Sequence, residues 1–129
     1  MERKLSLALI DDHEMVLQGL KALLSSNAGF EVKQCWTNGF EAVEHAKGDV
    51  DIYLVDMNMP EINGLETAEL LLRKVENAKV IFLSMELKKA YMDRAKDIGA
   101  MGYISKSASI DELMNSIKKV ANGQECFTN

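Results

Sequence analysis

Four short apolar runs in this chain are each followed by polar side chains that could do chemistry. In chain order these residues are Asp11 with Asp12, then Asp56, Ser84 and Lys106. A carboxylate of ordinary pKa is already ionised at neutral pH, so Asp56 could attack phosphorus without a general base. Phosphoryl transfer mostly needs positioning and charge neutralisation, which an ammonium, a hydroxyl and a metal ion can supply. These residue types therefore predict an aspartate that becomes phosphorylated.

A metal ion is expected beside the acids. Carboxylates that lie close together raise one another's pKa unless a positive charge neutralises them. Mg²⁺ suits this set because it binds one or two carboxylates, keeps several waters and leaves room for a phosphate. The Asn58 carbonyl could add an oxygen ligand, because Pro60 forces a turn that leaves nearby peptide groups facing the site. Zinc is disfavoured because His13 and His45 lack ligand spacing.

Each of these residues also has a simpler interpretation. Asp11 or Asp12 could cap a following helix, whose N-terminus favours an anion. Ser84 could be an ordinary hydroxyl at a strand end, and Lys106 an ordinary solvated lysine. Asp56 is harder to explain in this way, because it follows four apolar residues and would lie near the other two acids.

The elements that must position these residues alternate along the chain. Five apolar runs have the length of strands, at residues 5–10, 32–36, 52–55, 80–83 and 101–104. Helical patterns lie between them, and the poorest apolar stripe is in the fourth, at residues 87–98. Five such units predict an α/β fold with a parallel sheet covered by helices on both faces. In such sheets the functional groups gather at the carboxyl ends of the strands.

Length and composition limit the class of protein. The chain has 129 residues, 47% of them apolar, which suits one domain. A net charge of -5 makes this stretch a poor nucleic-acid binder by itself. No apolar run is long enough to cross a bilayer, so no membrane partner is expected. The two cysteines, Cys35 and Cys126, are interpreted as free thiols in a reducing cytoplasm.

At this point the chain resembles the receiver domain of a two-component response regulator, over about residues 5–122. Four stretches carry the resemblance: Asp11–Asp12, residues 56–60 with Gly64, Ser84 after its strand, and residues 102–106. Each stretch is weak alone, and all of them at these spacings are highly specific. The resemblance implies a flavodoxin-like (βα)5 three-layer sandwich with a five-stranded parallel sheet in the order 2-1-3-4-5.

The resemblance also implies roles for the site residues. A partner histidine kinase would phosphorylate Asp56, and Lys106 would contact the phosphoryl group. Mg²⁺ would be held by Asp12, Asp56 and the backbone carbonyl of Asn58, with Asp11 assisting. The protein would then not be an enzyme in its own right, but a signalling domain that assists only its own phosphorylation and dephosphorylation.

A switch is implied at two further positions. The Ser84 hydroxyl would move towards the phosphoryl group and the Tyr103 ring would turn inward behind it, shifting a two-state population at the surface of the fourth helix, fifth strand and fifth helix. Ser84 replaces the commoner threonine of the family, so the switch is expected to be less sharply coupled. Ser107 stands where a proline often follows the lysine, which leaves the family's cis bond in doubt.

Further motifs resemble the subgroup that joins a receiver to a helix-turn-helix DNA-binding domain. They are Asp11–Asp12–His13, Gly19–Leu20 and Ala121–Asn122–Gly123. On this basis residues 1–122 are expected to form the receiver domain and residues 123–129 to begin a linker to an output domain not present in this chain. DNA would be contacted only through that domain. A homodimer could form through helices one and five or four and five.

Two other classes remain open. A self-contained Mg²⁺-dependent phosphatase of the haloacid dehalogenase type also uses a strand-end aspartate, although such sites resemble Asp-x-Asp and position 58 is Asn. A receiver-like module that binds partners without phosphorylation is expected to have lost an acid or the lysine, and none is lost here.

Overall fold

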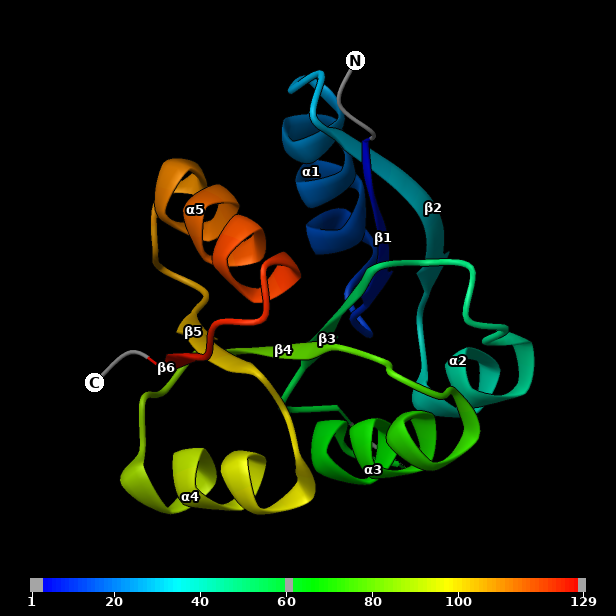
Figure 1. The fold of residues 1–129 in the computed structure, drawn as a ribbon, viewed down its shortest axis with the longest axis vertical. Helices are drawn as coiled ribbons and strands as arrows, with labels where there is room; N and C mark the ends of the chain where they lie inside the picture. Colours follow the sequence, from blue (N-terminus) through cyan, green and yellow to red (C-terminus); the bar gives the residue numbers. More distant parts are fainter. Residues whose placement is uncertain (1–3, 60–61, 128–129) are drawn as a thin grey trace.

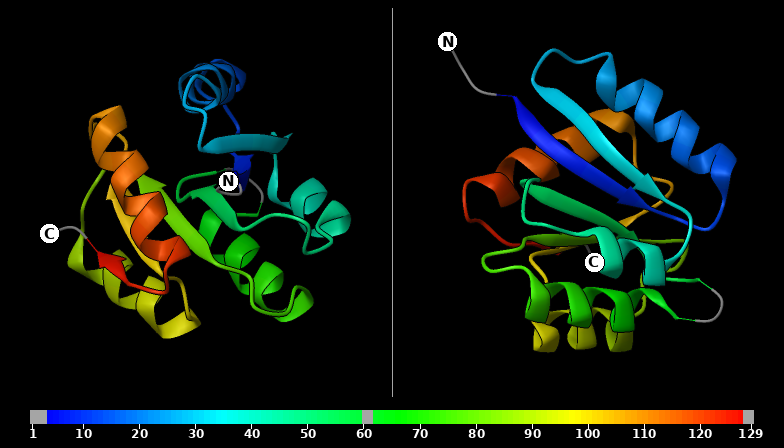
Figure 2. Two further views of the ribbon diagram at one scale, coloured as in Figure 1. Left: turned by 45° about the horizontal axis from the view of Figure 1, so that its top comes forward. Right: turned by 90° about the vertical axis from the view of Figure 1, so that its right-hand side faces the viewer.

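The computed structural model describes residues 4–59 and 62–127. Helices and strands alternate along these residues, and the sheet lies between two helical layers (Figures 1 and 2). The elements are β1 (Leu5–Ile10), α1 (Glu14–Ser25), β2 (Phe30–Trp36), α2 (Gly39–His45), β3 (Ile52–Asp56), α3 (Gly64–Lys74), β4 (Val80–Ser84), α4 (Lys89–Ile98), β5 (Gly102–Ser105), α5 (Ile110–Ala121) and β6 (Cys126–Phe127).

All neighbouring strands are parallel and follow the order β2-β1-β3-β4-β5-β6. The predicted flavodoxin-like order 2-1-3-4-5 is confirmed, and a sixth short strand that the sequence pattern did not predict extends it. After α5 the chain turns back at Gly123, whose φ of +88° suits a residue without a Cβ. The Cys126 N–H then donates to the Met101 carbonyl at 2.8 Å, which adds β6 to the outer edge of β5.

The core has two halves, one on each face of the sheet. Helices α1 and α5 cover one face and α2, α3 and α4 cover the other (Figure 1). Successive residues of a strand point to opposite faces, so Leu54 packs with the α1 and α5 side while Tyr53 and Val55 pack with the other. Every residue of β3 is buried. This double cover explains why its sequence is continuously apolar until Asp56.

The junction between β3 and α3 is held tightly. The Asn63 side chain caps α3 by accepting a hydrogen bond from the Glu66 N–H at 2.9 Å. The Gly64 N–H donates to the Met57 carbonyl at 3.2 Å, and a Cβ at Gly64 would lie 2.3 Å from the Asp56 carbonyl oxygen. Glycine is therefore required where α3 approaches the strand. The predicted turn at Pro60 lies outside the described residues.

The last two helices differ at their N-termini. The Ser109 hydroxyl caps α5 by accepting a hydrogen bond from the Glu112 N–H at 3.1 Å. Helix α4 starts at Lys89, later than expected, and its N-cap residue Lys88 makes no side-chain cap bond. Among the described residues, no helix combines the length and apolar character that crossing a membrane requires.

Candidate functional site

Asp56 lies at the carboxyl end of the buried strand β3 and is only 2% exposed. Its Oδ1 accepts a hydrogen bond from the Asn58 N–H at 3.1 Å and lies 3.0 Å from the Lys106 Nζ. The other carboxylate oxygen, Oδ2, has no hydrogen-bond partner among the residues that the structure describes. One oxygen of Asp56 is therefore held in place, and the second is available to an incoming group.

Lys106 joins the acids of two strands. Its backbone N–H donates to the Ser84 carbonyl at 2.8 Å, which fixes the lysine beside the end of β4. From there its Nζ lies 2.9 Å from Asp11 Oδ2 as well as 3.0 Å from Asp56 Oδ1. The Lys106 side chain is 14% exposed, so this ammonium is largely shielded from solvent. Its peptide bond to Ser107 is trans, since the described residues contain no cis bond.

The end of β1 supplies the other acids. The Asp11 N–H donates to the Trp36 carbonyl at 3.1 Å, and the Asp11 Oδ1 accepts a hydrogen bond from the His13 N–H at 2.9 Å. His13, rather than either aspartate, is the N-cap residue of α1. The simpler interpretation of Asp11 and Asp12 as helix caps is therefore wrong, because both carboxylates turn towards the pocket.

Burial dominates the electrostatics of Asp56. Desolvation raises the pKa of its carboxyl to about 6, with the Lys106 ammonium and the Asn58 N–H opposing the rise and Asp11 adding to it. Burial by itself lowers the pKa of Lys106, but its ion pairs with Asp11 and Asp56 outweigh this and raise it overall. Lys106 therefore remains an ammonium at neutral pH, while Asp56 is largely ionised.

The pocket fits a divalent cation. Ligand atoms of Asp11, Asp12, His13 and Asp56 all lie within 4.8 Å of one another. Three of the carboxylate oxygens, Asp11 Oδ2, Asp12 Oδ1 and Asp56 Oδ2, are buried. The Lys106 Nζ lies 2.9 Å from Asp11 Oδ2 and the His13 Nδ1 lies 3.1 Å from Asp12 Oδ1, whereas Asp56 Oδ2 has no hydrogen-bond partner among the described residues. Buried anionic oxygens without donors are costly, and a hard cation such as Mg²⁺ would satisfy them.

The two predicted switch residues meet at a backbone carbonyl. The hydroxyls of Ser84 and Tyr103 both donate to the Glu86 carbonyl, at 2.8 and 2.6 Å. Both side chains are fully buried, so the Tyr103 ring is already turned inward. The Ser84 hydroxyl is directed to Glu86, not to the acids. The structure thus brings together Asp11, Asp12, Asp56 and Lys106, and places Ser84 at the edge of this group.

Two participants were not identified from the sequence. His13 was given no ligand role because it lacks ligand spacing from His45, but its ring lies against two acids; its position directly after them was the available signal. Glu86 contributes only its backbone carbonyl, so its residue type gave no signal. The role of the Asn58 carbonyl as a metal ligand stays a prediction, since the structure shows only the contact of its N–H with Asp56.

A doubly wound parallel sheet with three acids and a lysine at its carboxyl edge defines the class of receiver folds. The sequence pattern of the response regulator receiver domain family matches residues 7–118. The chain therefore belongs to this family, as its motifs predicted.

The relatives are bacterial response regulators. The transcriptional regulatory protein DegU of Brevibacillus brevis is 35% identical over 123 residues, which cover 95% of this chain and 52% of DegU. The response regulator UvrY of Escherichia coli K12 is 33% identical over 93% of this chain and 56% of UvrY. A solved two-component response regulator of the LuxR family from Aurantimonas sp. SI85-9A1 superposes with a TM-score of 0.90 at 25% identity, covering 96% of this chain and 89% of that one. The chain spans about half the length of the curated relatives it matches.

Proposed function

We propose that Asp56 accepts a phosphoryl group from a histidine kinase in a Mg²⁺-dependent reaction. The observation that carries this proposal is the arrangement of Asp56 itself: one carboxylate oxygen is fixed by Asn58 and Lys106, and the other is buried without a partner. A pKa of about 6 leaves the carboxyl largely ionised at neutral pH, and therefore nucleophilic.

The transfer follows from these contacts. One carboxylate oxygen of Asp56 forms a bond to phosphorus as the bond between phosphorus and the phosphohistidine nitrogen breaks, and the leaving imidazole takes up a proton. The Lys106 ammonium neutralises charge on the phosphoryl oxygens while holding the aspartate in position. Bound Mg²⁺ would be held by Asp11, Asp12, Asp56 and the Asn58 carbonyl, and would supply further neutralisation and orientation.

The signal is proposed to leave the site through Ser84. Its hydroxyl donates to the Glu86 carbonyl, which Tyr103 shares. A phosphoryl group on Asp56 offers Ser84 a stronger, charged acceptor. When Ser84 turns to it, the Glu86 carbonyl is left to Tyr103, and the turn before α4 loses one of its bonds. The surface of α4, β5 and α5 changes as a result.

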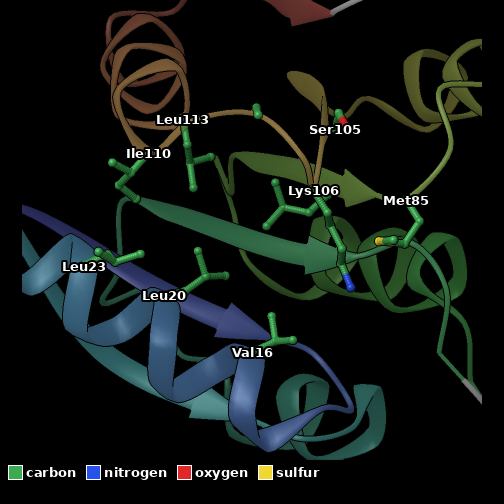
Figure 3. A pocket seen from close by; sticks show the side chains of 10 residues that line it. Val16, Leu20, Leu23, Met85, Ser105, Lys106, Ile110 and Leu113 are labelled. Carbon is green, nitrogen blue, oxygen red and sulfur yellow. The ribbon is translucent and has the colours of Figure 1, made fainter.

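The kinase is proposed to approach over α1 and α5. A pocket of about 330 Å³ lies between these helices, with apolar side chains on both walls and Lys106 at one end (Figure 3). Met85, which is 73% exposed, lines this pocket together with Lys106. Apolar groups next to a buried acid suit a protein donor that must exclude water.

The output is proposed to be transcription, through a DNA-binding domain in a longer protein. This chain corresponds to about half of DegU, whose name describes a transcriptional regulatory protein. A cytoplasmic location is proposed because both cysteines, Cys35 and Cys126, are free thiols in the described structure.

Intact mass spectrometry after incubation with acetyl phosphate and Mg²⁺ tests the phosphorylation. The wild-type chain should gain the mass of one phosphoryl group, and the gain should disappear when Mg²⁺ is removed by a chelator. Asp56→Asn should gain nothing, because the amide is not a nucleophile for phosphorus.

A matched control is Asp97→Asn, which alters an exposed acid of α4 and should be phosphorylated like the wild type. No mass gain in the wild type, with Mg²⁺ binding demonstrated, would favour a module that works without phosphorylation. Release of many equivalents of phosphate per chain would instead favour a phosphatase.

A further inference from the structure

The His13 ring faces the same pocket as the acids. Its Nδ1 lies 3.2 Å from Asp11 Oδ1 and 3.1 Å from Asp12 Oδ1. The backbone fixes this position, because the His13 N–H donates to Asp11 Oδ1 and the residue begins α1. The side chain is 66% exposed, and the ring faces the acids with its Nδ1.

These separations match those of ligands around one metal ion. Bonds of about 2.1 Å at right angles place neighbouring ligand atoms about 3 Å apart, as Nδ1 and the two carboxylate oxygens are. A second observation also indicates a ligand: Asp56 is 2% exposed, and its Oδ2 is buried without a hydrogen-bond partner among the described residues. One ligand atom from each of His13, Asp11, Asp12 and Asp56 can be chosen so that all four lie within 4.8 Å of one another.

The nature of the added atom determines which metals benefit. Mg²⁺ prefers oxygen ligands, so a nearby imidazole adds little to its binding. Nickel, cobalt and zinc bind imidazole well, and their affinity for nitrogen-containing sites exceeds that of the earlier divalent metals. The pocket therefore offers two kinds of coordination, one from oxygens alone and one from oxygens with a nitrogen.

We propose that His13 is a metal ligand that selects borderline divalent ions, so that the acid pocket binds Ni²⁺, Co²⁺ and Zn²⁺ through one imidazole nitrogen as well as carboxylates. This proposal goes beyond the proposed function. The two have in common only the acids Asp11, Asp12 and Asp56. In a cell, such ions would compete with Mg²⁺ for the pocket.

Calorimetric titrations of the whole chain with Ni²⁺ and, separately, with Mg²⁺ test the proposal. His13→Ala should weaken Ni²⁺ binding by about tenfold or more while leaving the Mg²⁺ affinity nearly unchanged. The control is His45→Ala, which removes the chain's only other histidine, from the exposed end of α2, and should alter neither affinity. Asp56→Asn should weaken the binding of both metals.

Proton NMR with Co²⁺ gives a direct readout. A coordinated imidazole should show a strongly shifted, exchangeable N–H resonance in the wild type and in His45→Ala, and none in His13→Ala. Circular dichroism should confirm that His13→Ala is folded, since the side chain is exposed and makes no cap bond.

Two results would overturn the proposal. If His13→Ala changes the Ni²⁺ and Mg²⁺ affinities by the same factor, His13 acts only as a charged neighbour of the acids. If the shifted resonance persists without His13, another group binds the metal. Neither readout involves phosphorylation, so this proposal and that of an Asp56 phosphoacceptor can fail independently.

Discussion

At the level of single residues, the ionised Asp56 carboxylate opposes folding when no cation is bound. Burial raises the pKa of this carboxyl from 3.8 to about 6, so the folded chain holds the proton more tightly than the unfolded chain. Between these two values the free energy of unfolding falls as the pH rises, and above about pH 6 the whole loss is present. The site therefore reduces stability in order to keep a reactive acid.

Replacing the charge should recover that stability. In metal-free buffer near pH ~7, Asp56→Asn should increase the free energy of unfolding by on the order of 2 kcal/mol, because the amide carries no buried charge. The gain should shrink towards pH ~4, where the wild-type carboxyl is protonated in the folded state. Urea denaturation at both pH values measures the difference.

Mg²⁺ provides a further test of this electrostatic account. It should raise the stability of the wild type, whose carboxylates it neutralises, more than that of Asp56→Asn, and so narrow the gap between them. Asp97→Asn, on the exposed surface of α4, should show no comparable gain. Easier unfolding of Asp56→Asn than of the wild type at neutral pH would contradict the account.

The convergence of the acids and the lysine could be predicted from residue types, because a parallel sheet brings its strand ends to one edge. Asp11, Asp56 and Lys106 lie far apart in the sequence, yet the shared direction of β1, β3 and β5 was enough to predict that they meet. The orientation of individual groups was not predictable. The Ser84 hydroxyl donates to the backbone carbonyl of Glu86. Every residue type has a backbone carbonyl, so the sequence could not indicate this contact.

At the level of elements, the contact of α3 with the end of β3 holds Asp56 in place. Gly64→Ala would put a Cβ 2.3 Å from the Asp56 carbonyl oxygen and 2.7 Å from the Met57 Cα, where only backbone could yield. We expect a loss of about 2 kcal/mol or more in the free energy of unfolding. Phosphorylation of Asp56 by acetyl phosphate should also slow, because the strand end must shift.

The matched control is Gly19→Ala in the middle of α1. No atom lies within 4 Å of the added Cβ there, and the position is exposed. Alanine is the better helix former, so this variant should be more stable by about 0.5–1 kcal/mol. Thermal unfolding of the two variants beside the wild type should show shifts of opposite sign. Shifts of the same sign and size in the unfolding temperature would mean that the close packing at Gly64 does not require glycine.

Elements were predictable where their hydrophobic period was strong. The apolar runs in the sequence predicted β1, β3 and β4, because strands covered on both faces need mostly apolar residues. β6 was missed because a two-residue strand, Cys126–Phe127, is too short to show a period. Its existence depends on a tertiary contact, the bond from the Cys126 N–H to Met101, which the local sequence does not encode.

At the level of the whole molecule, β6 ties the chain after α5 to the edge that carries Tyr103. Phe127 pairs with Tyr103 across the two strands, and its ring packs against the core beneath α4. The Lys96 Nζ lies 5.0 Å from the centre of that ring. β6 therefore pairs with the strand that carries Tyr103, the residue that is expected to respond when Asp56 is phosphorylated.

Cys126 makes the docking of β6 measurable. Its thiol is partly buried and contacts the Ser116 hydroxyl at 3.2 Å, so a thiol reagent should reach it mainly when β6 opens. In a Cys35→Ser background, Phe127→Ala should speed modification of Cys126 about fivefold, as expected if the lost ring contributes about 1 kcal/mol to docking. Phe40→Ala, which removes a 58% exposed ring from α2, should leave the rate unchanged. Equal rates of Cys126 modification with and without the Phe127 ring would show that β6 opens independently of its packing beside Tyr103. The edge of β5 would then not transmit the signal.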